Sequence, residues 1–280
     1  MTRRDFVVGG AAAVGTTVFG VESARKPRLA FHVYAVRDLC EGDLVETLKK
    51  ARSIGYEGVE TGRFYGRGAA EWNSICKDIG LELIALQLYP HMLTEPQIGQ
   101  TIRFCHESGC LRINAAWFKG SRENSNDWKL VVNVINHAAE VCAKEGIEIG
   151  YHNHDQEFLT FFDGKTALSW LYERFDSRVK QEFDPGWCVL AGQDPCTWLK
   201  THPCRNPTMH VMPAISETDV IRTRPGVAGI GSRYDQVDWR NFLPSARNDG
   251  VEWFVVKPTA HPDSLDDLVA SYGYLADSMH

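Results

Sequence analysis

Beyond its N-terminus, the chain has no cluster of basic residues. It carries 30 Lys and Arg against 36 Asp and Glu, which gives a formal net charge of -6 at pH 7. Binding to nucleic acid or to an anionic membrane surface depends on a positive patch that neutralises phosphates. We therefore expect neither partner, and small, neutral or locally recognised ligands remain as candidates.

The cysteines form no CxxC pair and follow no repeated spacing, although the chain contains eight of them. A disulfide framework is therefore not indicated. Cys76, Cys105 and Cys142 fall on the apolar faces of expected helices, where a cysteine behaves as a small buried hydrophobe. We expect buried free thiols, with a bridge between Cys196 and Cys204 as the alternative.

The first 25 residues differ in character from the rest of the chain. Arg3 and Arg4 precede an uncharged run of small and apolar residues, Phe6–Val21. This pattern is typical of a twin-arginine export signal, and the run is too short and too rich in Gly and Ala for a membrane anchor. We expect a signal peptide over 1–25 and a mature domain over 26–280. Such a protein folds in the cytoplasm, often with a cofactor bound, before export to the periplasm, and it has no membrane contact once the signal is removed.

The remaining sequence alternates between short apolar runs and segments with helical periodicity. The expected strands lie at 28–36, 56–60, 81–89, 111–117, 147–152, 179–184, 208–212 and 251–257. The expected helices lie at 41–55, 72–80, 95–108, 126–145, 166–174 and 194–202, followed by a helix shortened to a turn near Trp239 and a last helix at 264–277. Eight such units predict a single-domain α/β fold, a (β/α)8 TIM barrel. No GxGxxG motif follows the first strand, which disfavours a doubly wound dinucleotide-binding sheet.

Polar residues close several of the expected strands, namely Glu60, His152, Asp184, His210 and Lys257. In a parallel barrel these strand ends meet at one face, where the chemistry of the fold takes place. Side chains alternate between the two faces of a strand, so the parity of each position decides where it points. The inward-facing positions are expected to be Glu148, Gly150, His152 and His154, then Lys180, Glu182 and Asp184, and finally Lys257. This parity is consistent with one shared site.

Several motifs in the chain resemble those of a known family. They are VYAVRD at 33–38, IGYEGVE at 54–60, GYHNHDQEF at 150–158, FDPGW at 183–187, MHV at 209–211 and GIGSRYDQVDW at 229–239. Together they resemble the xylose isomerase-like TIM-barrel family of sugar-phosphate isomerases and epimerases, over nearly all of the chain after the signal. GYHNHDxEF is the specific motif among them.

The resemblance implies a divalent ion, manganese, zinc or magnesium, held at the ends of strands five to eight. By position, it implies His152, Asp184 and His210 as ligands. The sequence departs from the family at Lys257, where a Glu ligand is usual, because an ammonium group has no lone pair for a metal. Three alternatives follow: three protein ligands plus water, a fourth ligand from Glu60 or Glu157, or no metal at all.

Sugar isomerisation needs a proton removed next to a carbonyl and a cation that stabilises the resulting enediolate. The candidate catalytic residues are Glu60, His152, Glu157 and Lys257, with Asp184 as a further candidate base. The candidate substrate-binding residues are His32, His154 and Trp187, and Trp117 and Phe64 are further candidates for stacking on a sugar. The long segment 213–237 is expected to cover a ligand. Structural alternatives are that Asn153 and His154 only hold the loop after the fifth strand, and that Glu148, Lys180 and Glu182 form an ion-pair network inside the barrel.

The expected function is that of an exported isomerase or epimerase acting on a sugar or sugar derivative. Its expected ligand is a small carbohydrate, and an oligomer is possible. Two alternatives are a lyase or hydrolase on keto-sugars and a catalytically degenerate, carbohydrate-binding barrel in which Lys257 has displaced the metal. The related abasic-site endonuclease activity is disfavoured by the charge.

Overall fold

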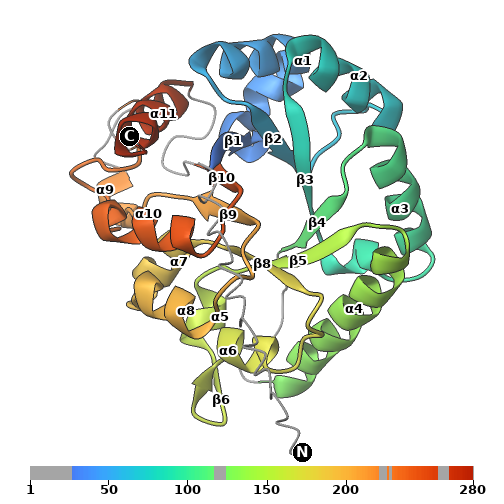
Figure 1. Cartoon of the computed structure of the whole chain (residues 1–280), viewed down its shortest axis with the longest axis vertical. Helices are drawn as coiled ribbons and strands as arrows, with labels where there is room; N and C mark the ends of the chain where they lie inside the picture. The colour runs from blue at the N-terminus through green and yellow to red at the C-terminus, as the bar shows by residue number, and fades with distance from the viewer. Residues whose placement is uncertain (1–26, 117–123, 221–225, 227–228, 258–264, 280) are drawn as a thin grey trace, which may run out of the picture.

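The barrel is formed by parallel strands that close in the order β1-β10-β9-β8-β5-β4-β3-β2 (Figure 1). The computed structural model describes residues 27–116, 124–220, 226, 229–257 and 265–279. The barrel strands are β1 (Arg28–His32), β2 (Gly58–Thr61), β3 (Glu82–Leu88), β4 (Arg112–Ala115), β5 (Glu148–His152), β8 (Lys180–Phe183), β9 (Thr208–Val211) and β10 (Trp253–Val256). The expected (β/α)8 barrel is therefore confirmed, whereas the expected signal segment lies outside the described residues.

Helices surround the barrel on all sides in the view of Figure 1. They are α1 (Arg37–Ile54), α2 (Ala69–Ile79), α3 (Gln97–Ser108), α4 (Ser125–Lys144), α5 (Gln156–Leu159), α6 (Ala167–Tyr172), α7 (Pro185–Leu190), α8 (Pro195–Thr201), α9 (Glu217–Val220), α10 (Trp239–Asn248) and α11 (Leu265–Ser278), with short 3-10 turns η1 (Val33–Val36) and η2 (Pro90–Leu93). Within the described residues, none of these helices is both long and apolar enough to cross a membrane.

Three elements differ from the sequence-based expectation. The first strand ends at His32, because the chain turns into η1 there. The helix expected to be a mere turn near Trp239 is the ten-residue α10, whose buried Trp239, Phe242, Leu243 and Ala246 have helical spacing despite Pro244. A small hairpin, β6 (Phe161–Phe162) and β7 (Lys165–Thr166), precedes α6 and was not expected.

Because side chains alternate along the strands, one apolar core lies outside the barrel wall and another lies inside it. Phe254 and Val256 of β10 join the large apolar core between the strands and the helices. Trp253 and Val255 point the other way, into a small cluster with side chains of β1 and β3. Lys257, the next residue of the same parity, therefore faces the interior, as expected from the sequence.

The cysteines are all free thiols, so the alternative bridge between Cys196 and Cys204 is not formed. The cysteines that were placed on apolar helix faces, Cys76, Cys105 and Cys142, are buried. Burial raises the pKa of the Cys76 thiol to about 12. Such a thiol stays protonated and unreactive, which suits a packing role.

Candidate active site

Polar side chains from most of the barrel strands converge inside the barrel, towards the C-terminal ends of the strands. They are His32, Glu60, Gln87, Asn114, His152, Glu182, Asp184, Thr208, His210 and Lys257, and all of them are buried. We call this set the polar cluster. Because unpaired polar groups are costly to bury, a cluster of this size indicates a binding or catalytic site.

His210 links two parts of the polar cluster. Its Nε2 lies 2.7 Å from Glu60 Oε2 and 3.3 Å from Glu182 Oε2. Its Nδ1 lies 3.8 Å from Asp184 Oδ2, which is too long for a hydrogen bond. The centre of its ring is 4.2 Å from that of His152. Glu60 therefore fixes the ring through one nitrogen, while the other nitrogen is directed at Asp184.

Glu60 is itself held across the barrel by Asn114. The Asn114 Nδ2 group donates to Glu60 Oε1 at 3.1 Å and to Thr208 Oγ1 at 3.2 Å. Space for this amide comes from Gly150, since a Cβ there would lie 2.3 Å from Asn114 Oδ1. The glycine in GYHNHDQEF thus faces the interior, as its parity predicted, and its lack of a side chain makes room for Asn114.

Asp184 is fixed by the turn that follows β8. Its backbone N–H donates to Asn153 Oδ1 at 3.0 Å, and Asn153 Nδ2 donates to its carbonyl at 3.2 Å. Its Oδ1 caps α7 by accepting from the N–H groups of Gly186 and Trp187. With Oδ1 engaged in this way, Oδ2 has no hydrogen-bond partner among the described residues and faces His210.

The charges within the polar cluster balance each other. Burial alone would lower the pKa of His210, but Glu182 and Glu60 raise it to about 9. Burial alone would raise the pKa of Glu60, but His210 lowers it to about 2. Burial and repulsion by Glu60 raise the pKa of Glu182 to about 8. Glu60 and His210 thus favour each other's charged form, whereas burial and Glu60 drive Glu182 towards its neutral form.

The atoms around Asp184 suit a divalent cation. His152, Asp184 and His210 each offer one ligand atom, and these atoms all lie within 4.8 Å of one another. Asp184 Oδ2, His210 Nδ1 and both ring nitrogens of His152 are buried, and none of them has a hydrogen-bond partner among the described residues. Two imidazoles and one carboxylate are ligands that zinc and manganese accept. The three residues expected to be metal ligands therefore suit a divalent cation. Such an ion would replace a proton on His210 Nδ1.

Lys257 faces the same space from the end of β10. Its side chain is buried, and its Nζ lies 5.9 Å from the centre of the Tyr34 ring. Burial lowers the pKa of this amine, and Asp184 and the other carboxylates of the cluster oppose that change. A lysine thus occupies the position where the resemblance implied a carboxylate ligand.

Glu157, expected as a catalytic residue or a fourth ligand, lies outside the polar cluster. Its Oε1 accepts from the Tyr151 hydroxyl at 2.8 Å, and its Oε2 accepts from the His154 backbone N–H at 2.8 Å. Tyr151 points away from the barrel interior, and Glu157 lies on that side with it. This placement does not support a role in chemistry, and Glu157 instead anchors the loop after β5.

The alternative of an interior ion-pair network among Glu148, Lys180 and Glu182 is not formed in the described part of the chain. Glu148 lies 2.8 Å from Arg112, near the start of the strands, while Glu182 belongs to the polar cluster with His210. The sequence placed both carboxylates on the inner parity, but they lie at opposite ends of the barrel. Glu182 therefore belongs to the site, as its inward parity allowed, and not to the alternative ion-pair network.

The aromatic side chains expected to contact a sugar are spread over separate places. His154 packs against Trp187, with ring centres 5.6 Å apart, and near His152, with ring centres 4.8 Å apart. Phe64 packs on Phe104, with ring centres 4.3 Å apart, as part of the core. Trp117 lies outside the described residues.

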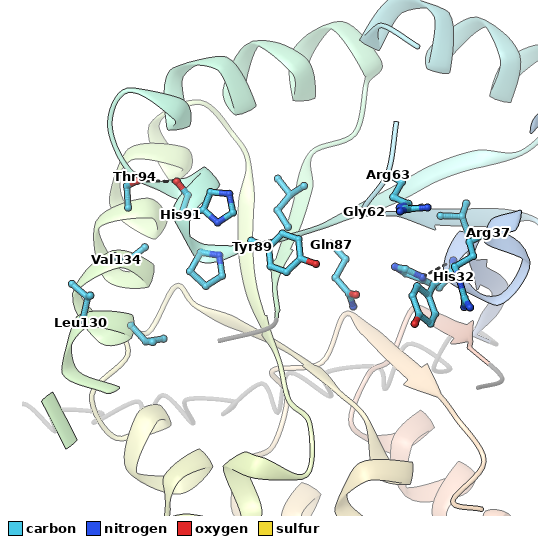
Figure 2. A pocket seen from close by; sticks show the side chains of 15 residues that line it. His32, Arg37, Gly62, Arg63, Gln87, Tyr89, His91, Thr94, Leu130 and Val134 are labelled. Atoms are coloured by element: carbon cyan, nitrogen blue, oxygen red, sulfur yellow. Dashed lines mark hydrogen bonds between the residues drawn. The ribbon is translucent and has the colours of Figure 1, made fainter. Parts of the chain in front are cut away.

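A large cavity of about 1150 Å³ opens beside the polar cluster, over the ends of β1, β2 and β3 and against α4 (Figure 2). His32 and Gln87 belong to both: the His32 ring centre is 5.7 Å from that of His210, and Gln87 Nε2 donates to Glu182 Oε2 at 3.5 Å. None of the described residues that line this cavity comes from 213–237, the segment expected to cover the ligand.

His32 presents one ring nitrogen to this region. Its Nδ1 accepts the Tyr34 N–H at 3.0 Å, and burial lowers the pKa of the ring to about 3. In a neutral imidazole that accepts at Nδ1, the proton sits on Nε2. His32 Nε2 has no hydrogen-bond partner among the described residues, so it is a free donor beside the cavity.

Several residues of the site were missed by sequence reasoning. Gln87, Asn114 and Thr208 stand next to apolar residues of β3, β4 and β9 that join the outer core, and Arg37 lies in the VYAVRD segment. The parity of these three polar positions, opposite to that of their apolar neighbours, was the signal that could have identified them. Arg37 lines the cavity and has a buried Nη1 without a hydrogen-bond partner among the described residues.

The chain resembles several solved structures along most of its length. A sugar phosphate isomerase/epimerase from Parabacteroides distasonis is 20% identical, with a TM-score of 0.71 over 91% of this chain and 95% of that chain. An L-ribulose 3-epimerase is 10% identical, with a TM-score of 0.67 over 90% of this chain and 94% of that chain. A D-allulose 3-epimerase from Methylomonas sp., in complex with D-allulose, is 12% identical, with a TM-score of 0.66 over 91% of this chain and 98% of that chain.

At these identities the likeness establishes the fold alone. No curated protein resembles the chain closely enough to count as a match. The model of one protein family, described as the xylose isomerase-like TIM barrel, matches residues 48–268, which is most of the chain. The chain therefore belongs to the xylose isomerase-like TIM barrel family.

Proposed function

We propose that the chain is a sugar isomerase or epimerase that removes a proton next to a carbonyl group of a sugar or sugar derivative. The observation that carries this proposal is the convergence of His152, Asp184 and His210 on one point, next to a cavity. The similar structures support it, because two of those named above are ketose 3-epimerases. The N-terminal twin arginines support export to the periplasm.

His152, Asp184 and His210 are proposed to hold a divalent cation, manganese, zinc or magnesium. When bound, such an ion polarises a carbonyl oxygen and stabilises the negative charge that develops on it. Glu60 contributes indirectly, because its hydrogen bond to His210 Nε2 orients the ring that presents Nδ1. Partners of this kind typically strengthen metal binding about 10-fold to 100-fold.

Lys257 is the proposed acid and base. Burial lowers the pKa of its amine, which is the direction that a base accepting a proton from carbon requires. The alternative bases from the sequence are less suitable. Glu60 is engaged with His210 and Asn114, and Glu157 lies on the other side of the barrel wall.

His32 and Arg37 are the proposed contacts to substrate oxygens. His32 Nε2 and Arg37 Nη1 are both buried donors beside the cavity, and neither has a hydrogen-bond partner among the described residues. Buried donors of this kind gain most from a ligand that supplies the acceptor. A second function, sugar binding without catalysis, is favoured by the presence of Lys257 in place of a carboxylate ligand.

Proton exchange with solvent tests this proposal. The protein, supplied with Mn²⁺, is incubated in D₂O with a panel of aldoses and ketoses, and the C–H signal next to the carbonyl is followed by NMR. We expect exchange with at least one sugar, and a decrease of about 10² to 10⁴-fold in Lys257→Met. Lys180→Met is the matched control, since Lys180 begins β8, far from the C-terminal end of the strand.

Two outcomes contradict the proposal. Sugar binding without exchange across the whole panel would establish the binding function instead. Unchanged exchange in Lys257→Met would show that another residue is the acid and base.

A further inference from the structure

The cavity beside the polar cluster carries charged side chains of one sign only. Arg37 and Arg63 line it, and no Asp or Glu stands among its described lining residues. Figure 2 shows both arginines on the same side of the cavity as His32, opposite Leu130 and Val134 of α4. A neutral sugar gains little from a positive charge at this place, whereas an anionic substituent is attracted by it.

Arg37 is the arginine whose charge is available to a ligand. Its Nη1 is buried and has no hydrogen-bond partner among the described residues. Its Nε lies 3.8 Å from Asp38 Oδ1, but the Asp38 side chain is 69% exposed, so water screens this ion pair. Burial of a charged donor without a partner is costly, and the cost is offset when a ligand supplies the acceptor.

Tyr34 orients Arg37 within reach of the proposed acid and base. Arg37 Cζ lies 4.5 Å from the centre of the Tyr34 ring, and a guanidinium over the face of a ring keeps its N–H groups available as donors. Lys257 Nζ lies 5.9 Å from the centre of the same ring. The two cationic groups are therefore separated by no more than the sum of these distances. A six-carbon chain of about 6 Å, with a hydrogen bond of about 3 Å at each end, covers such a separation.

The single available charge favours a carboxylate over a phosphate. Arg63 Nη1 is already paired with Glu41 Oε1 at 3.0 Å, and both side chains are exposed. His32 adds no charge, because burial lowers the pKa of its ring to about 3. One guanidinium balances the single charge of a carboxylate and matches its two planar oxygens, whereas a phosphate group carries a charge of about −1.5 to −2.

We propose that the substrate is a sugar acid whose carboxylate binds Arg37. This inference rests on the proposed function, because it assigns the other end of the same molecule, the carbonyl with its neighbouring C–H, to the polar cluster and Lys257. His32 lies near both ends, with its ring centre 6.4 Å from that of Tyr34 and 5.7 Å from that of His210, so its free Nε2 would donate to a hydroxyl of the chain. An open-chain hexuronate has this arrangement, with a carboxylate at one end and an aldehyde or ketone at the other.

Binding measurements on matched sugars test the inference. Titration calorimetry, on protein supplied with Mn²⁺, compares each hexose with its uronate, in which a carboxylate replaces the hydroxymethyl group, and with its 6-phosphate. The panel contains aldoses and 2-ketoses, so every ligand has a carbonyl beside a C–H in its open-chain form. We expect at least one uronate to bind at least about tenfold more tightly than both its parent hexose and the 6-phosphate.

Variants of Arg37 locate the carboxylate. In Arg37→Gln, the ratio of the affinities for uronate and hexose should fall at least about fivefold, because the charge and the fork of donors are lost. Arg37→Lys keeps the charge without the fork and should retain part of the preference. Arg103→Gln is the matched control, because Arg103 is exposed on α3 and does not line the cavity.

Three results would overturn the inference: no uronate binds more tightly than its parent hexose, a hexose 6-phosphate binds more tightly than every uronate, or the ratio is unchanged in Arg37→Gln. Proton exchange in D₂O on the same ligands separates this inference from the proposed function. A preference for a uronate that depends on Arg37, without exchange, supports the inference and contradicts the isomerase. Exchange on neutral sugars without such a preference does the reverse.

Discussion

Glu60 and His210 lie 150 positions apart in the chain, yet Glu60 Oε2 and His210 Nε2 are 2.7 Å apart in the middle of the barrel. The contact joins β2 to β9, which are not neighbours in the barrel wall, so both side chains must cross the interior. This pair turns the remaining nitrogen of His210 towards Asp184. A single carboxylate thereby orients one ligand of the proposed metal site.

Replacing Glu60 by Gln should weaken metal binding without unfolding the protein. The amide of the new side chain would still accept a hydrogen bond from His210, but it would no longer carry the charge that makes the ring a better ligand. We expect the affinity for Mn²⁺ to fall about 10-fold to 100-fold in Glu60→Gln, measured by calorimetry on metal-free protein. Glu57→Gln is the control, because Glu57 lies on the surface beside Arg28. Equal affinities in the two variants would show that Glu60 does not support His210.

Glu157→Gln should affect stability and leave catalysis unchanged. The carboxylate accepts hydrogen bonds from the Tyr151 hydroxyl and the His154 N–H, and burial raises its pKa. A neutral amide has only one oxygen and can accept only one of these two hydrogen bonds. We therefore expect the free energy of unfolding, measured with urea, to fall by about 1–3 kcal/mol. Loss of proton exchange at full stability would instead restore Glu157 as a catalytic candidate.

Acid should destabilise the protein through His32. Burial lowers its pKa to about 3, whereas an unfolded histidine titrates near about 6.5. Between these two values the unfolded chain binds more protons, so stability decreases as the pH falls from about 6.5 towards 3, by up to about 1.4 kcal/mol per pH unit. In His32→Gln, urea unfolding at pH 7 and pH 5 should show about 2 kcal/mol less loss than in the wild type. His137→Gln is the control, because His137 lies on the exposed surface, and this variant should lose as much stability as the wild type. If His32→Gln also lost as much as the wild type, burial of His32 would not be the cause of the acid sensitivity.

Strand parity allowed much of the site to be predicted from the sequence. The two-residue period placed His152, Asp184 and Lys257 on the inner face of a parallel barrel, where the structure has them, whereas His210 was implied by the resemblance. Their convergence follows from the closure of the barrel, which repetition of strand and helix predicted. The same period failed for Glu148, because parity gives the face of a strand and not the height along the barrel.

Side chains that act through non-local contacts could not be predicted in this way. Glu157 belongs to the specific motif, but only the fold shows that its carboxylate turns back to Tyr151. The cavity is built by η1, η2 and α4 together, so no single segment of sequence carries its shape. Arg37 therefore became a candidate only once the fold placed it at this cavity.

The central claim is that His152, Asp184 and His210 act as one cation site that faces Lys257. Titration of metal-free protein with Mn²⁺ tests it most directly, using the wild type, Asp184→Asn and Lys257→Glu. In Lys257→Glu, the affinity for Mn²⁺ should rise at least about tenfold, because the positive charge is removed and a carboxylate is added. In Asp184→Asn, the affinity should fall at least about tenfold, because a charged ligand is lost. Equal affinities in all three proteins would contradict the account, because the three side chains and Lys257 would then not share a site.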